Sequence, residues 1–229
     1  MNHIFDPFNL ILIGVAAFIF WRLKSVLGTR TGNDRPPVEF GTKPAPQPVP
    51  AALEPATPAT LEPAAPKTPV WQGHAREGSA EAKALEAIAA ADSQFTVPDF
   101  LEGARLAYEM IVDAFAQGDK RALKPLLASD VHESFSAAID ERLRLGETMQ
   151  SKLVAISHAE IEGAEINGRR ASLTIRFVSE FVTARLSREG EVLEGDPTKI
   201  REITDIWTFE RDVRSRDPNW RLAATEAPT

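Results

Sequence analysis

Residues 100–135 read FLEGARLAYEMIVDAFAQGDKRALKPLLASDVHESF, and this stretch decides the fold. Its first part predicts a helix, because one face collects the apolar residues Phe100, Leu101, Ala104, Tyr108, Ile111, Val112 and Phe115. Gly118 ends that helix, and Asp119 starts a second one, over 120–127, which Pro125 kinks or splits. Ser129 is expected to cap a third helix, which closes at Gly146.

Downstream of these helices the period of the apolar residues changes from about 3.6 to about 2, which indicates strands. A first strand is expected over 149–166, with a bulge near 157–160, and Asn167-Gly168 predicts a hairpin turn after it. One face of the second strand carries Ala171, Leu173, Ile175, Phe177 and Phe181. One face of the third strand carries Ile203, Asp205, Trp207, Phe209 and Val213, and a last strand has Trp220, Leu222 and Ala224 on one face.

The turns between these strands are expected at 189–190, 195–197 and 217–218, where Gly, Asp and Pro gather. Helices followed by a meander of antiparallel strands define the α+β class. We therefore expect residues 96–226 to form one domain, in which the helices pack on the concave face of a strongly curved four-stranded antiparallel sheet.

The region upstream of these helices is predicted to hold one more helix and a linker. Residues 79–93 are Ala-rich and predict an amphipathic helix that Ser79 caps. Residues 38–78 are expected to be a disordered Pro/Ala-rich linker, because eleven of the chain's 17 prolines lie between Pro36 and Pro69 and large apolar side chains are scarce. A proline-rich ligand for a recognition domain is the alternative interpretation.

Residues 4–23 are the expected membrane anchor. Residues 10–21, LILIGVAAFIFW, carry no charge, and extending the run to 4–23 gives about 20 residues, enough to cross a hydrocarbon core of about 30 Å. A cleavable signal peptide and a buried core helix are the alternatives, but no basic residue precedes the run and no Ala-x-Ala site follows it. The residues assigned to the span are Phe8, Leu10, Ile11, Leu12, Ile13, Phe18, Ile19, Phe20 and Trp21.

A basic juxtamembrane segment over 24–37 follows the anchor. Arg22, Lys24, Arg30 and Arg35 are expected to lie beside anionic lipid headgroups of the bilayer. Because the flank rich in Lys and Arg stays on the cytoplasmic side, we expect a single-pass protein with the bulk of the chain in the cytoplasm.

The charge and the cysteine content exclude several classes of function. The 229-residue chain has a formal net charge of -7, and residues 71–229 hold 20 Lys and Arg against 28 Asp and Glu. An acidic folded portion argues against nucleic acid as a partner. The absence of cysteine excludes disulfides, thiolate metal sites and a catalytic thiol. His132 and His158 lack a third ligand at a recognisable spacing, so no metal site and no cofactor are expected.

Asp205 is the candidate for acid–base chemistry. It shares a face with Trp207 and Phe209, so it is expected to point between sheet and helices, where a carboxylate can abstract a proton beside an apolar ligand. A structural ion pair with Arg176 or Arg142 is the favoured interpretation. No phosphate loop, nucleophile elbow or HExxH string is present. We therefore expect no catalytic residue and no enzyme.

An apolar pocket is the other candidate site, because curved sheets covered by helices frequently keep one. Its expected lining is Tyr108, Phe115, Phe135, Phe177, Trp207 and Phe209. A hollow pocket of this kind would take an acyl lipid chain or a hydrophobic side chain of a protein partner. Plain core packing is the alternative interpretation of the same residues.

Three strings carry a resemblance to a known family. They are RLKSVLGTRTGNDRPP (22–37), the 100–135 stretch quoted above, and ITDIWTFERDVRSRDPNWRLAAT (203–225). Together they resemble the bacterial TimA proteins of the Tim44-like family, relatives of the C-terminal domain of the mitochondrial presequence-translocase scaffold. The resemblance covers about residues 4–37 and 96–226, leaving out the linker and the Ala-rich helix. It implies a cone-shaped, NTF2/cystatin-like α+β fold and a place at the bacterial inner membrane.

The resemblance also implies a role. The mitochondrial relative recruits a chaperone motor to a protein translocase and binds acidic lipids such as cardiolipin. We therefore expect a membrane-anchored adaptor or scaffold, whose cytoplasmic domain binds an unknown protein partner and is linked to protein translocation. A lipid-binding or lipid-transport module is the alternative, followed by a small enzyme of the cone-shaped superfamily. The sequence sets no oligomeric state.

Overall fold

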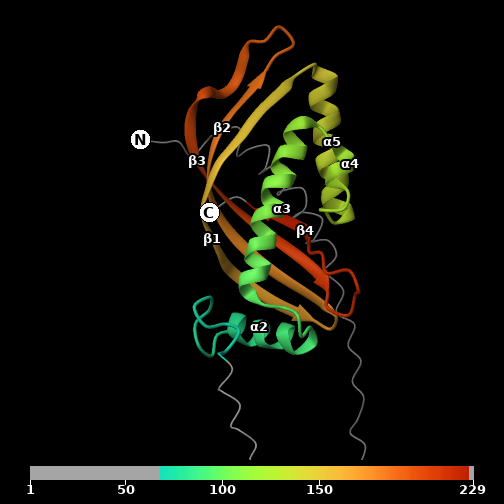
Figure 1. Ribbon diagram of the computed structural model, residues 1–229. Coiled ribbons are helices and arrows are strands. Elements are labelled where there is room, and N and C mark those ends of the chain that lie inside the picture. The colour runs from blue at the N-terminus through green and yellow to red at the C-terminus, as the bar shows by residue number, and fades with distance from the viewer. Residues whose placement is uncertain (1–67, 227–229) are drawn as a thin grey trace, which may run out of the picture.

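A computed structural model describes residues 68–226, which form four helices and four strands (Figure 1). The predicted anchor (4–23), the basic segment (24–37) and the linker up to residue 67 lie outside the described residues. Within the described part, no helix is both long and apolar enough to cross a membrane. The described residues therefore comprise the predicted domain, the Ala-rich helix and the turns just before it.

The long helix α3, Val97–Gln117, crosses the face of the sheet and provides most of the helical side of the core (Figure 1). Thr96 caps it: its hydroxyl accepts from the backbone N–H of Asp99 and donates to the Asp99 carboxylate at 2.7 Å. Gly118 ends it in the left-handed conformation, with φ of 75°. The predicted first helix is thus present, and it ends at Gly118 as expected.

The next two helices, α4 (Lys120–Leu123) and α5 (Ser129–Leu145), lie beside α3. The second helix is shorter than the predicted 120–127, because Pro125 cannot continue the backbone hydrogen bonds of the turn before it. The expected cap by Ser129 is wrong: Ser129 is the first helical residue, and Ala128 precedes it without a side-chain cap. The N–H of Ala128 instead donates to the carbonyl of Leu222.

The sheet is an antiparallel meander in the order β1-β2-β3-β4, and its long strands bend around the helices (Figure 1). Its strands are β1 (Thr148–Asn167), β2 (Arg170–Leu186), β3 (Val192–Asp212) and β4 (Arg221–Glu226). On β2 the residues Ala171, Leu173, Ile175, Phe177, Ser179 and Phe181 are all buried. They alternate with half-buried ones, which confirms the predicted faces.

Bulges account for most of the differences between the expected and the observed strands. β1 has three register shifts against β2, of which the one between Ile156 and His158 lies where a bulge was expected. The turn expected at 195–197 does not end a strand, because β3 continues through it. Residues 197–200 are exposed and have no partners on β2, so they form a bulge in β3. In β4 a register shift buries Leu222 and Thr225, so Ala224 does not share the buried face.

The Ala-rich helix α2, Ala80–Ala91, belongs to the same core as the sheet. Leu85 and Ile88 are fully buried in it, against β1. The chain just ahead of α2, residues 68–78, was assigned to the linker but forms turns, in which Trp71 packs on the core and donates its indole N–H to Glu86 at 2.7 Å. A large aromatic side chain gives these residues something to bury, which the Pro/Ala-rich part lacks.

Candidate functional site

An apolar cavity of about 70 Å³ lies between the helices α3 and α5 and the concave face of the sheet. We call it the cavity. Its lining residues are Tyr108, Ile111, Val112, Phe115, Phe135, Ala138, Met149, Ser151, Phe181, Thr183, Ile203, Asp205 and Trp207. The lining residues of each helix are three or four positions apart, so they lie on one helix face. The lining residues of β2 and of β3 are two positions apart, so they point to the same side of the sheet. The helical period of about 3.6 and the strand period of about 2 thus bring these side chains to the cavity.

Four of the six residues expected to line a pocket are brought together here. Tyr108, Phe115, Phe135 and Trp207 line the cavity, whereas Phe177 and Phe209 do not. Phe177 lies deeper, stacked on Tyr108 with ring centroids 4.5 Å apart, and Phe209 packs edge-on against Phe100. Both are fully buried and form part of the filled core.

Sequence reasoning missed several lining residues, of which Phe181, Thr183 and Ile203 have the correct strand parity. Parity alone could have found these three, because they continue the inward faces of β2 and β3. Met149 could not have been found in this way, since the register shifts of β1 determine which of its side chains face inward.

Asp205 is the only charged residue in the lining, and its partner is Tyr108. The Tyr108 hydroxyl donates to Oδ2 of Asp205 at 2.6 Å, and the hydroxyl of Ser179 lies 2.8 Å from the Tyr108 oxygen. The expected ion pair of Asp205 is therefore wrong. Arg176 faces the opposite side of the sheet, where it pairs with Glu162, and Arg142 binds backbone carbonyls of α3.

Burial is the main cause of the shifted pKa values of Tyr108 and Asp205. Removal from water raises the pKa of the Asp205 carboxyl, and the hydrogen bond from Tyr108 opposes part of that rise. Burial also raises the pKa of Tyr108, and the neighbouring carboxylate raises it further. The Tyr108 hydroxyl therefore stays protonated and acts as a donor, while the protonated form of Asp205 is favoured beyond its ordinary range.

A groove of about 300 Å³ continues the cavity toward the end of the molecule formed by the β2–β3 hairpin and the end of α5. We call it the rim groove. Cavity and groove share four lining residues, which form the mouth between them: Phe115, Ala138, Met149 and Thr183. The groove adds polar and charged side chains that the cavity lacks.

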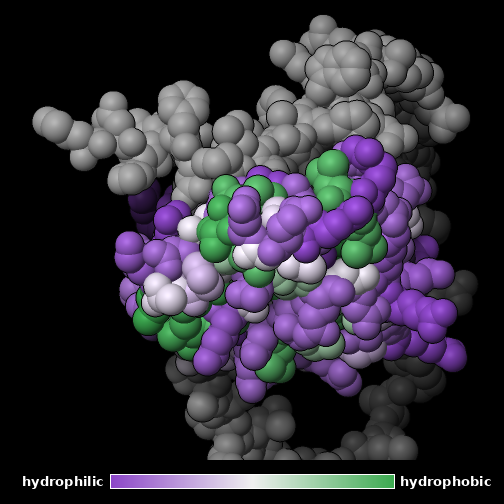
Figure 2. Space-filling view, turned by 90° about the horizontal axis from the view of Figure 1, so that it is seen from above, coloured by the Kyte–Doolittle hydropathy of each residue, from purple (hydrophilic) through white to green (hydrophobic). Residues whose placement is uncertain are grey.

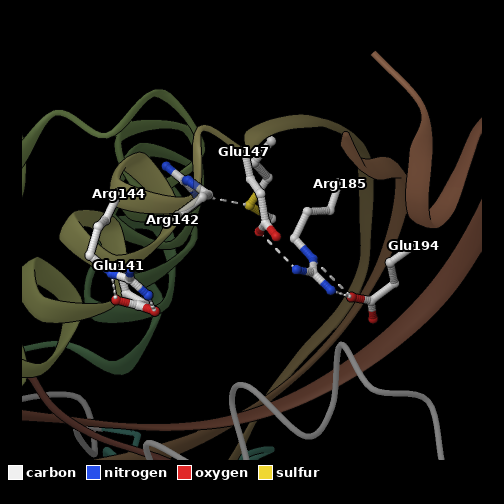
Figure 3. A network of polar contacts seen from close by, with 7 residues as sticks. Glu141, Arg142, Arg144, Glu147, Arg185 and Glu194 are labelled. Atoms are coloured by element: carbon white, nitrogen blue, oxygen red, sulfur yellow. Dashed lines mark hydrogen bonds and ion pairs between the residues drawn. The ribbon is translucent and has the colours of Figure 1, made fainter. Parts of the chain in front are cut away.

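Figure 3 shows the charged residues of the rim groove. Arg185 lies between two carboxylates, 2.8 Å from Glu147 and 3.2 Å from Glu194, and the hydrogen bond that it donates to Glu147 is the main reason that its pKa is raised. The second oxygen of Glu194 is buried and has no hydrogen-bond partner among the described residues. The groove thus combines an apolar floor with an ordered charged wall.

Arg142 connects the groove to the end of α3. Its Nη2 donates to the carbonyls of Phe115 (2.8 Å) and Ala116 (3.0 Å) in the last turn of α3, where the Phe115 carbonyl also accepts from the N–H of Gly118. Its Nη1 lies 3.2 Å from the sulfur of Met149 (Figure 3). Partial burial lowers the pKa of this guanidinium, which nevertheless remains a cation.

Exposed apolar side chains gather on the elements around the groove. Figure 2 looks onto this end of the molecule and shows hydrophobic groups, in green, among hydrophilic ones. The exposed large apolar residues on α5 and on the first part of β3 are Leu143, Leu145, Val192, Leu193 and Ile200. Such a surface is typical of a site that contacts another molecule.

The other residues considered for chemistry lie apart from the cavity. His132 places Nε2 3.0 Å from the carbonyl oxygen of Lys120, and His158 is exposed on β1. In the described part of the chain, no cluster of His, Asp and Glu is arranged to hold a metal ion.

The fold and the cavity define an α+β domain in which helices cover one face of a meander sheet and leave an apolar hollow between the layers. The model of the Tim44-like domain family matches residues 81–227, more than half of the chain. The chain therefore belongs to the Tim44-like family. The match includes α2, which the resemblance noted in the sequence had left outside, and this agrees with the burial of α2 in the common core.

The curated relatives are mitochondrial import inner membrane translocase subunits. TIM44 of Mus musculus is 25% identical over 114 residues, which are 49% of this chain and 25% of the relative. TIM44-1 of Arabidopsis thaliana is 22% identical over 148 residues, 62% of this chain and 31% of the relative. The chain thus spans only about a quarter to a third of the length of these relatives.

Similar solved structures include the intermembrane space region of the chloroplast protein ARC6, with a TM-score of 0.40, 12% identity, and coverage of 56% of this chain and 95% of that one. An NTF2-like superfamily protein from Salmonella enterica has a TM-score of 0.31, 14% identity, and coverage of 58% and 90%.

Proposed function

We propose that the chain is a membrane-anchored, non-enzymatic adaptor, whose Tim44-like domain holds a protein partner at the bacterial inner membrane in connection with protein translocation. Two observations on the sequence and its family support this. The relatives are named as translocase subunits of a mitochondrial inner membrane. The run 4–23, which ends at Arg22 and Leu23 and is followed by Lys24, Arg30 and Arg35, has the composition of a membrane anchor with a basic flank.

The observation that carries the proposal is the cavity with its rim groove. The walls of the cavity are mainly apolar, and the rim groove beyond it opens at one end of the domain. Exposed apolar side chains lie on the elements around that opening. A protein interface needs an apolar pocket for an anchoring side chain and a polar rim around it. The charged wall formed by Glu147, Arg185 and Glu194 supplies such a rim. We infer that a partner inserts a side chain through the mouth.

A lipid-binding module is the competing function, and the dimensions favour it less. Pockets that enclose small-molecule ligands usually measure about 300–1,000 Å³. The cavity has about 70 Å³, and the groove of about 300 Å³ beyond it is open and partly charged. A single inserted side chain fits these volumes better than the acyl chains of a phospholipid.

The test uses two neighbouring alanines of α5. Ala138 lies at the mouth, whereas Ala137 is exposed outside the lining. In cells that carry the full chain with a photo-crosslinking residue in place of Leu145, we expect one discrete crosslinked protein of the inner membrane. Ala138→Trp, which fills the mouth, should abolish the crosslink, and Ala137→Trp should leave it unchanged. Removal of residues 1–35 should weaken it strongly.

Two results would reject the adaptor. One is a crosslink pattern that is the same from Leu145 as from Val154, an exposed residue of β1 outside both hollows. The other is a pattern insensitive to Ala138→Trp. If native mass spectrometry of the full chain shows a bound phospholipid that Ala138→Trp removes, and no protein is crosslinked, the lipid-binding function replaces the adaptor.

A further inference from the structure

A second groove, of about 530 Å³, lies beside the N-terminal part of α3, and we call it the α3 groove. Most of its lining comes from the residues between α2 and α3, from α3 up to Met110, and from residues 218–220 of the β3–β4 connection (Figure 1). It shares no lining residue with the cavity or the rim groove. The α3 groove is therefore a separate surface, which the proposed adaptor leaves without a role.

Aromatic rings and exposed apolar side chains line the α3 groove. Phe100 and Trp220 are in edge-on contact there, with ring centroids 4.8 Å apart. Leu106 and Met110 are 56% and 54% exposed, although both are large and apolar. Such side chains, beside a groove of the size that usually holds a ligand, indicate a surface that another segment covers.

The charged side chains of the α3 groove are engaged within the domain, and one donor is free. Asp92 pairs with Arg211 at 2.6 Å, and Asp99 accepts from the hydroxyl of Thr96 at 2.7 Å. The indole nitrogen of Trp220 is not buried, and no described residue accepts its hydrogen. The groove therefore suits an uncharged segment that offers a backbone carbonyl to this N–H.

The chain itself contains a segment of this kind. Residues 55–61 read PATPATL and carry no charge. A polyproline II helix has three residues per turn, so this repeat places Pro55, Pro58 and Leu61 on one edge, the alanines on a second edge and the threonines on the third. Two of the three edges are thus apolar, and the backbone carbonyls are free because this helix makes no internal hydrogen bonds.

The segment is long enough, and close enough in the chain, to fill the α3 groove. Trp71 contacts Glu86 of α2, which lies six residues, or about 9 Å of helix, before Asp92 at the groove. Residues 62–67 join the segment to the described chain and extend to about 19 Å in the polyproline conformation. From its start to Met110, α3 rises about 20 Å, and seven polyproline residues span about 22 Å.

We propose that residues 55–61 dock in the α3 groove as a polyproline II segment, with their apolar edges against Leu106, Met110 and the Trp220 ring. The threonine edge faces water, and the indole N–H of Trp220 donates to a carbonyl of the segment. Aromatic-lined grooves recognise proline-rich segments in this way, because the preformed helix loses little conformational entropy on binding. The length of chain between the predicted anchor and the domain is then set by the residues before 55.

The experiment attaches one nitroxide spin label to the full chain in lipid nanodiscs and follows its tryptophan indole signals by NMR. The chain has no cysteine, so Thr57→Cys provides a single labelling site, on the edge that faces water. Trp220→Phe identifies the Trp220 signal among those of the four tryptophans. We expect the label to remove most of the intensity of the Trp220 signal, relative to the same sample after the nitroxide is reduced.

Two matched variants distinguish docking from mere proximity along the chain. Ala59→Asp and Thr60→Asp place the same charge on neighbouring residues, the first on an apolar edge and the second on the threonine edge. In the labelled chain, Ala59→Asp should restore most of the Trp220 intensity, whereas Thr60→Asp should leave the loss unchanged. Both variants keep the length of the chain and lie outside residues 68–226, so the folding of the domain is not at stake.

The inference is overturned if the label leaves the Trp220 signal intact, or if the two aspartate variants have the same effect. A mixed sample tests whether the segment comes from a second copy. It combines a spin-labelled chain without isotope with an isotope-labelled chain without nitroxide, and we expect the Trp220 signal to keep its intensity. A loss in the mixed sample as large as that within one chain would assign the α3 groove to the segment of another copy and reject docking within one chain.

Discussion

Nη1 of Arg211 lies 2.6 Å from Oδ2 of Asp92, and this ion pair joins β3 to the residue that follows α2. Each side chain is only 12% exposed. Nε of Arg211 also donates to the carbonyl of Asp217, 3.3 Å away, so one guanidinium holds the helix end and the β3–β4 connection together. The pair is thus the polar part of the contact between α2 and the sheet.

The first prediction concerns this pair. Asp92→Ala leaves a mostly buried guanidinium without its carboxylate, and we expect the free energy of unfolding to fall by about 2 kcal/mol. Arg176→Ala removes an exposed pair with Glu162 and should cost less than about 0.5 kcal/mol. Urea denaturation followed by circular dichroism measures both. Equal losses for the two variants would contradict the role given to Arg211 and Asp92.

The second prediction concerns the pH dependence of stability. Burial raises the folded-state pKa of Asp205 above its ordinary value of 3.8, so the folded state binds this proton more tightly than the unfolded state. The contribution of Asp205 to stability is therefore fully present below pH 3.8 and is lost as the pH rises through the folded-state pKa.

Asp205→Asn removes the titrating carboxyl, so comparing the wild type with this variant isolates the contribution of Asp205 to the pH dependence of stability. The unfolding free energy of the wild type minus that of Asp205→Asn should fall as the pH rises from about 4 to about 8. When the same comparison is made in the Tyr108→Phe background, the stability difference should continue to fall to higher pH. The hydrogen bond from Tyr108, which opposes the rise in the pKa of Asp205, is then gone. A difference that is constant over this range, or that increases with pH, would show that burial does not control this carboxyl.

The third prediction compares Gly190, in the turn between β2 and β3, with Gly195, which lies in β3 opposite Ala184. Both have left-handed backbones, with φ of 79° for Gly195 and 85° for Gly190. A Cβ on Gly195 would lie 2.3 Å from the carbonyl oxygen of Thr183, whereas one on Gly190 would meet open space. Gly190→Ala should therefore cost about 1 kcal/mol of unfolding free energy through backbone strain alone.

Gly195→Ala should cost at least about 2 kcal/mol, since the backbone of β2 must also move. Because Gly195 and Thr183 both line the rim groove, this variant should also weaken the crosslink from Leu145. Thermal or urea unfolding of the two variants side by side provides the measurement. A smaller loss for Gly195→Ala than for Gly190→Ala would refute the close approach of the strands.

The fourth prediction uses two arginines in the last turn of α5. Arg142→Ala removes two hydrogen bonds to carbonyls of α3 and the contact over the Phe115 ring, 5.2 Å from its centroid. We expect a loss of about 2 kcal/mol in unfolding free energy. Arg144→Ala removes only an exposed pair with Glu141 and should change stability by less than about 0.5 kcal/mol.

Arg142→Lys should recover less than half of the loss, because one ammonium nitrogen cannot bond both carbonyls and also keep the Nη1 contact with the Met149 sulfur and the planar contact over the Phe115 ring. Denaturant titration of the three variants tests this. Full recovery by lysine would mean that charge alone, and no particular geometry, holds α5 to α3.

The order of helices and strands, and the inward faces of β2 and β3, could be predicted because buried side chains recur at the periods of the two structures. Phe177 and Trp207 were placed on the correct face in this way. The partner of Asp205 could not be predicted, since Tyr108 is 97 residues away and only the packing of α3 on the sheet brings them together.

The lining of the cavity was predicted only in part for a related reason. Sequence pattern distinguishes inward from outward residues, but not the inward residues that fill space from those that border a hollow. Phe209 on β3 and Phe135 on α5 both face inward, yet Phe209 packs against Phe100 and Phe135 borders the cavity. The bulges of β1, which bring Met149 to the mouth, have no signal in the spacing of apolar residues.

The place of α2 has a consequence for how the domain is presented to its surroundings. α2 lies at one end of the molecule, and the β2–β3 hairpin with the rim groove lies at the other (Figure 1). Everything encoded before residue 68 therefore joins the domain at its base, so a tether there cannot occlude the mouth by its point of attachment. The opening of the rim groove therefore lies at the end of the domain opposite the point at which the described chain begins.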